Sequence, residues 1–255
     1  MSTISLPTLN KLNIYASLAH LLQALAVFML ARDFTLPINI SLLRFNQSTQ
    51  GLDPGVQEIY RLPLASLIIG FFLLSAFFHA IISTLYRRRY EQDLSQGINR
   101  LRWIEYALSA STMMVAIAML VGVYDLASLL MIFALTAGMN LMGLVMEVTN
   151  KKSKNPSWLS YLIGCGAGIV PWIVIALYFW ASSHYANSAP PTFVYYIYGS
   201  IFIFFNGFAI NMWLQYKRLG KWSNYLYGER TYIILSLVAK SALAWQVFAG
   251  TLRPN

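Results

Sequence analysis

The sequence has few charged residues. Only 11% of its 255 residues are Asp, Glu, Lys or Arg, whereas ordinary soluble domains carry about 25%. Hydrophobic residues make up 58% of the chain, and the mean hydropathy is +0.56. Because this composition cannot cover a water-soluble domain with polar surface, most of the chain is expected to face lipid.

Cysteine is almost absent as well. The single cysteine, Cys165, can form no disulfide within the chain, which excludes a disulfide-stapled secreted domain. It lies in an apolar segment, where a small packing residue is expected. The first residues also lack the basic region and cleavage site of a signal peptide, so the first apolar segment is expected to stay as a membrane helix.

The sequence is rich in long apolar segments. A membrane-spanning helix needs about 20 such residues, and we find seven segments, at 12–31, 62–86, 101–124, 126–149, 158–181, 193–216 and 231–250. A β-barrel is disfavoured because its strands are about 10 residues long and alternate in polarity. The sequence therefore predicts an all-α membrane protein with one seven-helix domain over residues 1–255.

The distribution of basic residues predicts the orientation. Thirteen of the 18 Lys and Arg residues flank the segments on the side of the N-terminus, four lie on the other side, and Lys240 lies within the last segment. Cytoplasmic loops carry the excess of basic residues, so we expect a cell-membrane protein with a cytoplasmic N-terminus and an extracellular C-terminus. The net charge of +9 then suits anionic lipid headgroups, and we expect no nucleic-acid partner.

Two connections have recognisable patterns. The first loop, 32–61, is the only long one: its residues 36–45 alternate in polarity and are followed by Gly51 and Asp53-Pro54-Gly55, which predicts a small extracellular β-hairpin. The connection at Tyr124-Asp125 is so short that the third and fourth helices must be antiparallel neighbours.

Ionisable residues inside the apolar segments are the strongest functional signal, because a mid-membrane charge must be paired or functional. Lys240 lies about 15 Å from the start of the seventh segment, and Glu105 enters the third segment from the same side. Ser236 and Ser109 are each one helical turn from these residues. Other polar residues are expected at a similar depth, in a cytoplasmic polar cavity: His20, Gln23, His79 and Asn140.

Three interpretations of Lys240 and Glu105 remain open at this point. They could form a buried ion pair that only fixes helix register, or couple ions in a transporter. They also suit a Schiff base, in which a buried amine condenses with an aldehyde and keeps the carboxylate as counterion. The Schiff base is favoured because the repeats and interrupted helices typical of transporters are not apparent. Glu147, close to Lys151, is interpreted as a charge at headgroup level.

Two longer motifs resemble a known family. They are Arg102-Trp-Ile-Glu-Tyr-Ala-Leu-Ser-Ala-Ser in the third segment and Ser236-Leu-Val-Ala-Lys-Ser-Ala-Leu-Ala-Trp-Gln-Val-Phe-Ala-Gly in the seventh. With the inverted orientation, the long first loop and Asn211-Met-Trp-Leu-Gln-Tyr at the end of the sixth segment, the chain resembles a heliorhodopsin over nearly its whole length.

This resemblance implies a seven-helix rhodopsin-like bundle that binds all-trans retinal as a protonated Schiff base on Lys240. It also implies that Glu105 is the counterion, that Ser109 and Ser236 lie nearby, and that His20 and His79 line the cytoplasmic cavity. The family is usually homodimeric and is thought to signal. The retinal pocket is expected from residues near mid-span: Met113, Met114, Met139, Gly143, Gly168, Pro171, Trp172, Phe205 and Asn206.

The function predicted is a photoreceptor that signals to an unknown cytoplasmic partner and does not pump ions. The segment after Glu105 contains no second carboxylate before the loop residue Asp125, so the outer half offers no proton path. The alternative is a light-gated or passive proton conductor or transporter that uses the histidine cavity. An enzyme is disfavoured because no nucleophile with a base and an orienting group is apparent.

Overall fold

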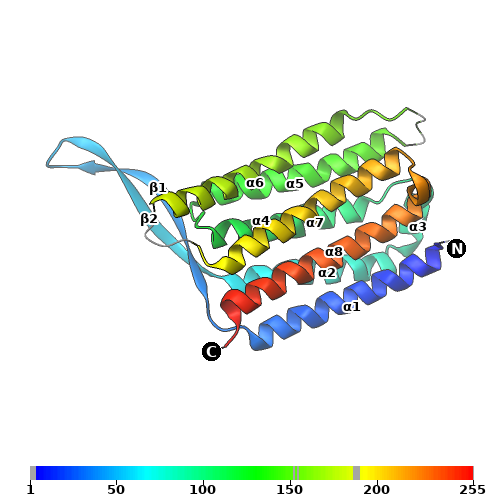
Figure 1. Ribbon diagram of the computed structural model, residues 1–255, viewed down its shortest axis with the longest axis horizontal. Helices are drawn as coiled ribbons and strands as arrows, with labels where there is room; N and C mark the ends of the chain where they lie inside the picture. Colours follow the sequence, from blue (N-terminus) through cyan, green and yellow to red (C-terminus); the bar gives the residue numbers. More distant parts are fainter. Residues whose placement is uncertain (1–3, 152, 154, 186–189, 255) are drawn as a thin grey trace.

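The computed structural model describes residues 4–151, 153, 155–185 and 190–254, and within them seven helices are long and apolar enough to cross a membrane. They lie side by side along the long axis of the molecule (Figure 1). The N-terminus is at one end of this bundle, called here the N-terminal end. A β-hairpin and the C-terminus mark the other end, called here the hairpin end.

The seven long helices match the predicted segments, although several begin earlier. They are α1 (Leu6–Leu30), α2 (Leu64–Ser83), α4 (Arg100–Leu120), α5 (Leu126–Thr149), α6 (Leu159–Tyr185), α7 (Thr192–Tyr216) and α8 (Tyr225–Val247), which continues as the π-helical turn η2 (Phe248–Leu252). The starts of α1 and α8 differ most from the prediction, and α8, which begins at Tyr225, includes Glu229. The central helix α4 is the most buried of the seven, and it packs against α2 on one side and α5 on the other.

Polar side chains at the helix starts explain several of these boundaries. Asn99 accepts a hydrogen bond from the backbone N–H of Arg102 at the start of α4, and Asp125 accepts one from Ser128 at the start of α5. Such caps satisfy backbone donors that have no partner within the helix. Because only residues 121–125 connect α4 to α5, the two helices are antiparallel neighbours, as predicted.

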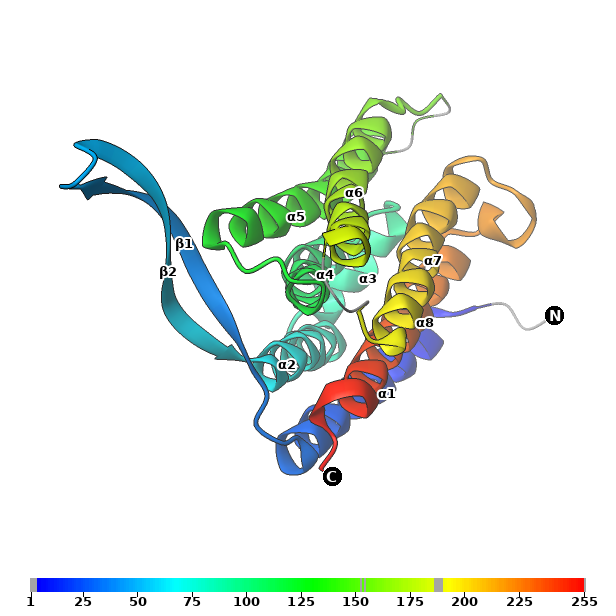
Figure 2. The same ribbon diagram turned by 60° about the vertical axis from the view of Figure 1, so that its left-hand side comes forward.

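The predicted hairpin is present. Strands β1 (Thr35–Asn46) and β2 (Gly51–Pro63) pair antiparallel, with a register irregularity between Ile38 and Asn39. At this irregularity the Asn39 N–H donates to the Tyr124 carbonyl at 2.8 Å, which ties the hairpin to the α4–α5 connection. Beyond that contact the hairpin projects away from the helices (Figure 2).

A short helix at the N-terminal end was not predicted. Helix α3 (Arg87–Ser95) follows α2 and presents charged residues outward while Tyr90, Asp93 and Leu94 are buried. Its sequence is too polar to resemble a membrane segment and too short for a strong periodic signal. Its Tyr90 side chain reaches the interior of the bundle, as described below.

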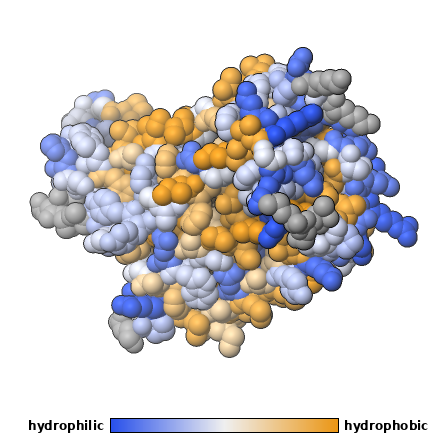
Figure 3. All heavy atoms as spheres, turned by 45° about the vertical axis from the view of Figure 1, so that its right-hand side comes forward, coloured by the Kyte–Doolittle hydropathy of each residue, from blue (hydrophilic) through white to orange (hydrophobic). Residues whose placement is uncertain are grey.

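The surface of the bundle is that of a protein embedded in lipid. Large apolar side chains are exposed along the helices, among them Leu22, Phe28, Phe77, Leu162 and Ile203. Apolar residues cover the middle of the face seen in Figure 3, and hydrophilic residues gather towards its ends. The chain is therefore a multi-pass membrane protein.

Candidate functional site

The two ionisable residues singled out in the sequence meet inside the bundle. Lys240 of α8 donates a hydrogen bond to Glu105 of α4, with Nζ 3.0 Å from Oε1, and the two side chains are only 2–4% exposed. Lys240 also donates to Ser236 Oγ at 2.6 Å, while Ser75 of α2 donates to Glu105 at 2.6 Å. These hydrogen bonds offset part of the cost of taking both charges out of water.

The surroundings of this pair come from three helices. Ser236 precedes Lys240 by one turn of α8, as the spacing predicts, and Ser109 is fully buried one turn after Glu105 in α4. The Tyr106 ring lies beneath the lysine, with Nζ 5.2 Å from the ring centroid. Ser75 was missed, because a serine in the apolar run of α2 carries no sequence signal of its own.

An apolar cavity begins at Lys240. Its inner part, of about 40 Å³, is lined by Lys240 and Ser236 together with Tyr106, Met113, Met139 and Phe205. An adjoining space of about 140 Å³ shares Met139, Asn140, Phe205 and Phe208 with it, and extends between α5, α6 and α7 past Trp172 and Phe202. The two spaces together form an elongated cavity that starts at the lysine amine.

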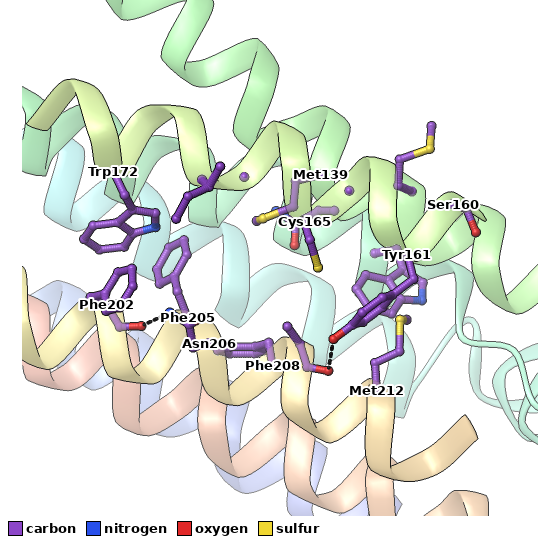
Figure 4. A pocket seen from close by; sticks show the side chains of 18 residues that line it. Met139, Ser160, Tyr161, Cys165, Trp172, Phe202, Phe205, Asn206, Phe208 and Met212 are labelled. Carbon is purple, nitrogen blue, oxygen red and sulfur yellow. Dashed lines mark hydrogen bonds between the residues drawn. The ribbon is translucent and has the colours of Figure 1, made fainter. Parts of the chain in front are cut away.

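Figure 4 shows the walls of the outer part of this cavity. Trp172 of α6 faces Phe202 and Phe205 of α7, and Met139 of α5 lies between these rings and Tyr161. Trp172 packs edge-on against Phe205 with ring centroids 5.5 Å apart. The polar groups are engaged: Asn206 donates to the Phe202 carbonyl, and Tyr161 donates to the Ala209 carbonyl (Figure 4).

Two glycines let the walls approach closely. A Cβ at Gly143 would overlap the Trp103 ring, and a Cβ at Gly168 would overlap the Met139 sulfur. The predicted pocket residues Met113, Met139, Gly143, Gly168, Trp172, Phe205 and Asn206 thus line the cavity. Met114 and Pro171 are buried but do not line it, and the aromatic residues Tyr106, Phe202 and Phe208 complete the walls.

The two histidines lie together on the other side of the ion pair. His20 of α1 and His79 of α2 stack with ring centroids 5.8 Å apart, and His79 Nδ1 is 2.7 Å from Asn13 Oδ1. Both ring nitrogens of His20 and Nε2 of His79 are buried with no hydrogen-bond partner among the described residues. In a neutral imidazole one ring nitrogen carries a proton and the other has a free lone pair, so each ring keeps one site where a proton could be added.

Gln23 and Asn140 do not lie beside the two histidines. Gln23 is half-buried and accepts a hydrogen bond from Trp245 of α8 at 3.0 Å. Asn140 lines the apolar cavity, where its amide donates to the Thr136 carbonyl one turn earlier. The expectation that all four residues form one polar cavity is therefore wrong. It rested on their similar depth along the helices, but Gln23 and Asn140 lie on helix faces that are turned away from the two histidines.

A second buried charge cluster lies closer to the N-terminal end. Arg102 of α4 forms ion pairs with Glu147 of α5 and Glu229 of α8, and all three are at most 4% exposed. The Arg102 guanidinium also lies 4.1 Å from the centroid of the Tyr232 ring. Interpreting Glu147 as a headgroup-level charge was wrong, because its carboxylate points into the bundle and is enclosed there.

Neighbouring donors complete this cluster. Glu147 accepts hydrogen bonds from the Trp103 indole at 2.8 Å and from the Tyr225 hydroxyl at 3.0 Å. Glu229 accepts from Tyr90 of α3 at 3.1 Å and from the Asn99 amide at 2.8 Å. Glu229 was not predicted to be buried, because the last apolar segment, 231–250, begins after it.

The two clusters are adjacent. Arg102, Glu229, Glu105 and His79 line the same small cavity, of about 10 Å³. Polar side chains therefore continue from Lys240 through Glu105 to the Arg102 cluster, whereas the cavity on the opposite side of Lys240 is apolar. Such an arrangement can hold a charged nitrogen at Lys240, place an apolar group beside it, and accept or return a proton on one side only.

Comparisons with known proteins agree with this geometry. The sequence profile of the family described as Heliorhodopsin matches residues 9–252. A crystal structure described as the light-driven proton pump LR (Mac) from Leptosphaeria maculans superposes with a TM-score of 0.68 and 13% sequence identity, covering 97% of this chain and 95% of that chain. At this identity the likeness establishes a shared fold only. No curated protein sequence matches the chain.

Proposed function

The chain belongs to the heliorhodopsin family, and we propose that it is a light sensor whose retinal is attached to Lys240. Family and fold together make it a retinal-binding, light-responsive membrane protein. The single observation that supports Lys240 as the attachment residue is its position: its amine lies 3.0 Å from Glu105 and at the inner end of the elongated apolar cavity.

The cavity fits an extended polyene. Its walls are methionine and aromatic side chains, and the amides of Asn140 and Asn206 are bonded to backbone carbonyls, so they do not require a polar ligand. Retinal in its all-trans form, bound through a Schiff base, would supply visible-light absorption and an isomerisation. Trp172, Phe205 and Met139 would hold its chain, with Gly168 leaving the space beside Met139.

Glu105 has the geometry of a counterion. Its carboxylate accepts from both Lys240 and Ser75, so its charge is held at a fixed position beside the lysine nitrogen. A negative charge at this distance stabilises a proton on that nitrogen. Ser236, at 2.6 Å from Nζ, orients the nitrogen from the other side.

We assign the N-terminal end to the cytoplasm on the basis of its excess of Lys and Arg residues. The polar groups that could take a proton from Lys240, namely His20, His79 and the Arg102 cluster, all lie towards this end. A change of charge there would alter the cytoplasmic surface, which suits signalling to a partner protein. Membrane lipid surrounds the bundle, and a homodimer is the assembly we propose.

A passive or light-gated proton conductor is the second candidate, and one observation favours it. His79, whose Nε2 has no hydrogen-bond partner among the described residues, lines the cavity that joins Glu105 to Arg102, and His20 stacks on its ring. A conductor also needs groups that can carry a proton from Lys240 to the hairpin end, and among the described residues the core there is apolar apart from hydroxyls bonded to their own helix, such as those of Ser111 and Thr251. The sensor is therefore favoured.

The absorption spectrum of the protein after addition of all-trans retinal tests this function. The wild type should develop a visible band, and Lys240→Ala should not, because the amine that binds the aldehyde is gone. Glu105→Gln should shift the band or lower the pH at which it fades, because the neutral amide no longer stabilises the cation.

A matched control separates attachment from folding. Ser241→Ala removes a polar group from the residue after Lys240 but does not touch the cavity lining, and it should leave the band unchanged. A visible band that survives in Lys240→Ala would refute the assignment of the attachment residue. An unchanged spectrum in Glu105→Gln would refute the counterion.

A further inference from the structure

A polar cavity of about 240 Å³ opens at the N-terminal end of the bundle. Three connections meet around it: the one between α3 and α4, the one between α5 and α6, and the one between α7 and α8, which includes the short helix η1 (Gly220–Ser223). It is separate from the apolar cavity beside Lys240. Its walls include the basic residues Lys151 and Arg218, and none of the described residues that line it carries a carboxylate.

The two basic side chains are available to a ligand. Among the described residues, neither Lys151 nor Arg218 makes a side-chain hydrogen bond or an ion pair, in contrast to Arg87 and Arg102, which are paired. The other polar side chains of the wall are largely engaged, for example Trp222, whose indole donates to Asn211 at 2.6 Å. The cavity therefore presents unpaired positive charge on a wall held in place by hydrogen bonds.

The backbone at Arg218 is strained. Helix α7 ends in a Schellman motif, in which Leu219 N–H bonds the Leu214 carbonyl and Arg218 N–H bonds the Gln215 carbonyl. The motif places Arg218 at the position usually held by glycine, and its φ is 53°. A side chain in this left-handed conformation costs stability, and the general excess of basic residues near a membrane does not require an arginine at this position.

We propose that this cavity binds a phosphate group, with Arg218 and Lys151 as its charged contacts. Phosphate suits the wall because arginine pairs with it through two parallel hydrogen bonds. The group could belong to a soluble phosphate compound or to the headgroup of an anionic lipid, and both present the same chemistry to these residues. The strained backbone at Arg218 would then be tolerated because it places this arginine in the cavity wall.

Tyr225 connects this site to the charge cluster. Its ring lines the cavity, and its hydroxyl donates to Glu147 at 3.0 Å, the carboxylate paired with Arg102. A bound anion would change the field at this carboxylate, and a change at Glu147 would alter the affinity for the anion by the same factor. This coupling rests on the proposed light sensor, whereas the phosphate site itself does not.

Calorimetric titration of inorganic phosphate into the full chain tests the site. With the protein in phosphatidylcholine nanodiscs at constant ionic strength, we expect saturable binding that weakens at least tenfold in Arg218→Gln. Lys221→Gln is the matched control: it removes the same charge from a neighbouring residue outside the wall, and its affinity should stay within twofold of the wild type. Equal losses in both variants would overturn the proposal in favour of general electrostatic attraction.

Arg218→Gly separates binding from folding. Glycine relieves the strain at this position, so the variant should unfold at a higher temperature than the wild type and yet bind phosphate at least tenfold more weakly. A variant that is more stable and binds equally well would show that Arg218 contacts no ligand. Such a result could not be attributed to misfolding.

A second arm identifies the source of the phosphate. If inorganic phosphate does not saturate the site, native mass spectrometry should detect phosphatidylglycerol retained by the wild type and lost from Arg218→Gln. Retention of neither ligand would overturn the proposal.

The coupling to Glu147 has its own test. Phosphate should shift the retinal band of the wild type but not that of Tyr225→Phe, and an unmoved wild-type band would refute the coupling. If no retinal band forms at all, phosphate binding to the retinal-free protein can still be measured, so the two proposals fail separately.

Discussion

The two halves of the bundle differ in whether they bury charged side chains. From Lys240 towards the N-terminal end, buried charges are numerous and paired: Glu105 with Lys240, and Glu147 and Glu229 with Arg102. Towards the hairpin end the core consists of apolar residues such as Phe71, Met114, Ile117, Leu243 and Val247. The buried polar groups there are hydroxyls that donate to their own helix, as Ser111 and Thr251 do.

In the proposed light sensor, this difference would allow Lys240 to respond to light without moving ions across the membrane. A proton that left the Lys240 nitrogen would find acceptors only on the N-terminal side, because the described residues of the other half offer no buried carboxylate or imidazole. The same asymmetry holds Lys240 at the boundary between a polar network and an apolar cavity. Four changes to the chain test whether the two halves differ as described.

The largest effect is expected from a charge placed in the apolar half. Ile117 is fully buried about 18 Å along α4 from Glu105, and Ile117→Asp would bury a carboxyl group with no partner, at a cost of several kcal/mol. We expect the variant to unfold at a much lower temperature or to fail to assemble. Ile117→Val, which should cost about 0.5–1.5 kcal/mol, is the control, and equal stability of the two would contradict an apolar outer half.

Removal of one partner from the paired half should be the next most damaging. Arg102→Gln leaves Glu147 and Glu229 buried without their cation, which typically costs about 3–5 kcal/mol. Thermal unfolding should show this loss, and Glu147→Gln with Glu229→Gln in the same chain should recover much of it. If Arg102→Gln alone were as stable as the wild type, the ion pairs with Arg102 would not be what stabilises the buried carboxylates of Glu147 and Glu229.

The apolar cavity should respond to volume and not to charge. Gly168→Leu would push Met139 into the cavity, and overpacking of this kind costs about 1–3 kcal/mol. Retinal uptake, followed by the visible band, should therefore weaken by roughly tenfold or more. Gly166 has open space around its Cα, so Gly166→Leu should take up retinal normally; equal losses in both variants would point away from this cavity.

The smallest effect concerns Asp125, a carboxylate at the hairpin end. Hydrogen bonds from the Ser128 backbone N–H and hydroxyl, joined by one from Ser41, lower the pKa of this half-buried group. Because folding lowers the pKa, the carboxylate stabilises the fold above the ordinary aspartate range, and this contribution is lost as the pH falls through the lowered pKa.

Asp125→Asn keeps the cap but removes the charge. Its unfolding temperature should lie slightly below that of the wild type at pH 7, and the gap should close as the pH falls to 3. Asp125→Ala, which removes the cap as well, should be less stable than Asp125→Asn at both values. A gap between wild type and Asp125→Asn that is constant with pH would mean that the ionised form has no special role.

Much of the fold and the centre of the site were predictable from the sequence. Long apolar segments fix the number of helices, and one costly charge in each of two helices identifies Lys240 and Glu105, because hydropathy and helical spacing act locally. Asn140 and Gln23 were misplaced because depth along a helix does not determine which neighbour a side chain faces. Ser75 and Phe208 were missed because such residues are ordinary in apolar helices and acquire a role only through packing.

The Arg102 cluster shows a second limit of the sequence. Its members lie near the ends of apolar segments, where charged residues normally reach the headgroup region. Whether such a charge faces lipid headgroups or the interior depends on the helices beside it, and here α3 encloses the cluster by inserting Tyr90. That helix is charged and short, so no hydropathy pattern in the sequence predicts it.

Light-induced proton movement is the most direct test of the central claim that charge moves in one half only. Cells or clamped membranes that hold the retinal-loaded protein should show no sustained photocurrent and no steady change of external pH during illumination. A brief displacement current that returns to zero agrees with a proton that leaves Lys240 and comes back from the N-terminal side. A sustained current, absent in Lys240→Ala, would contradict the account and show that the hairpin half conducts.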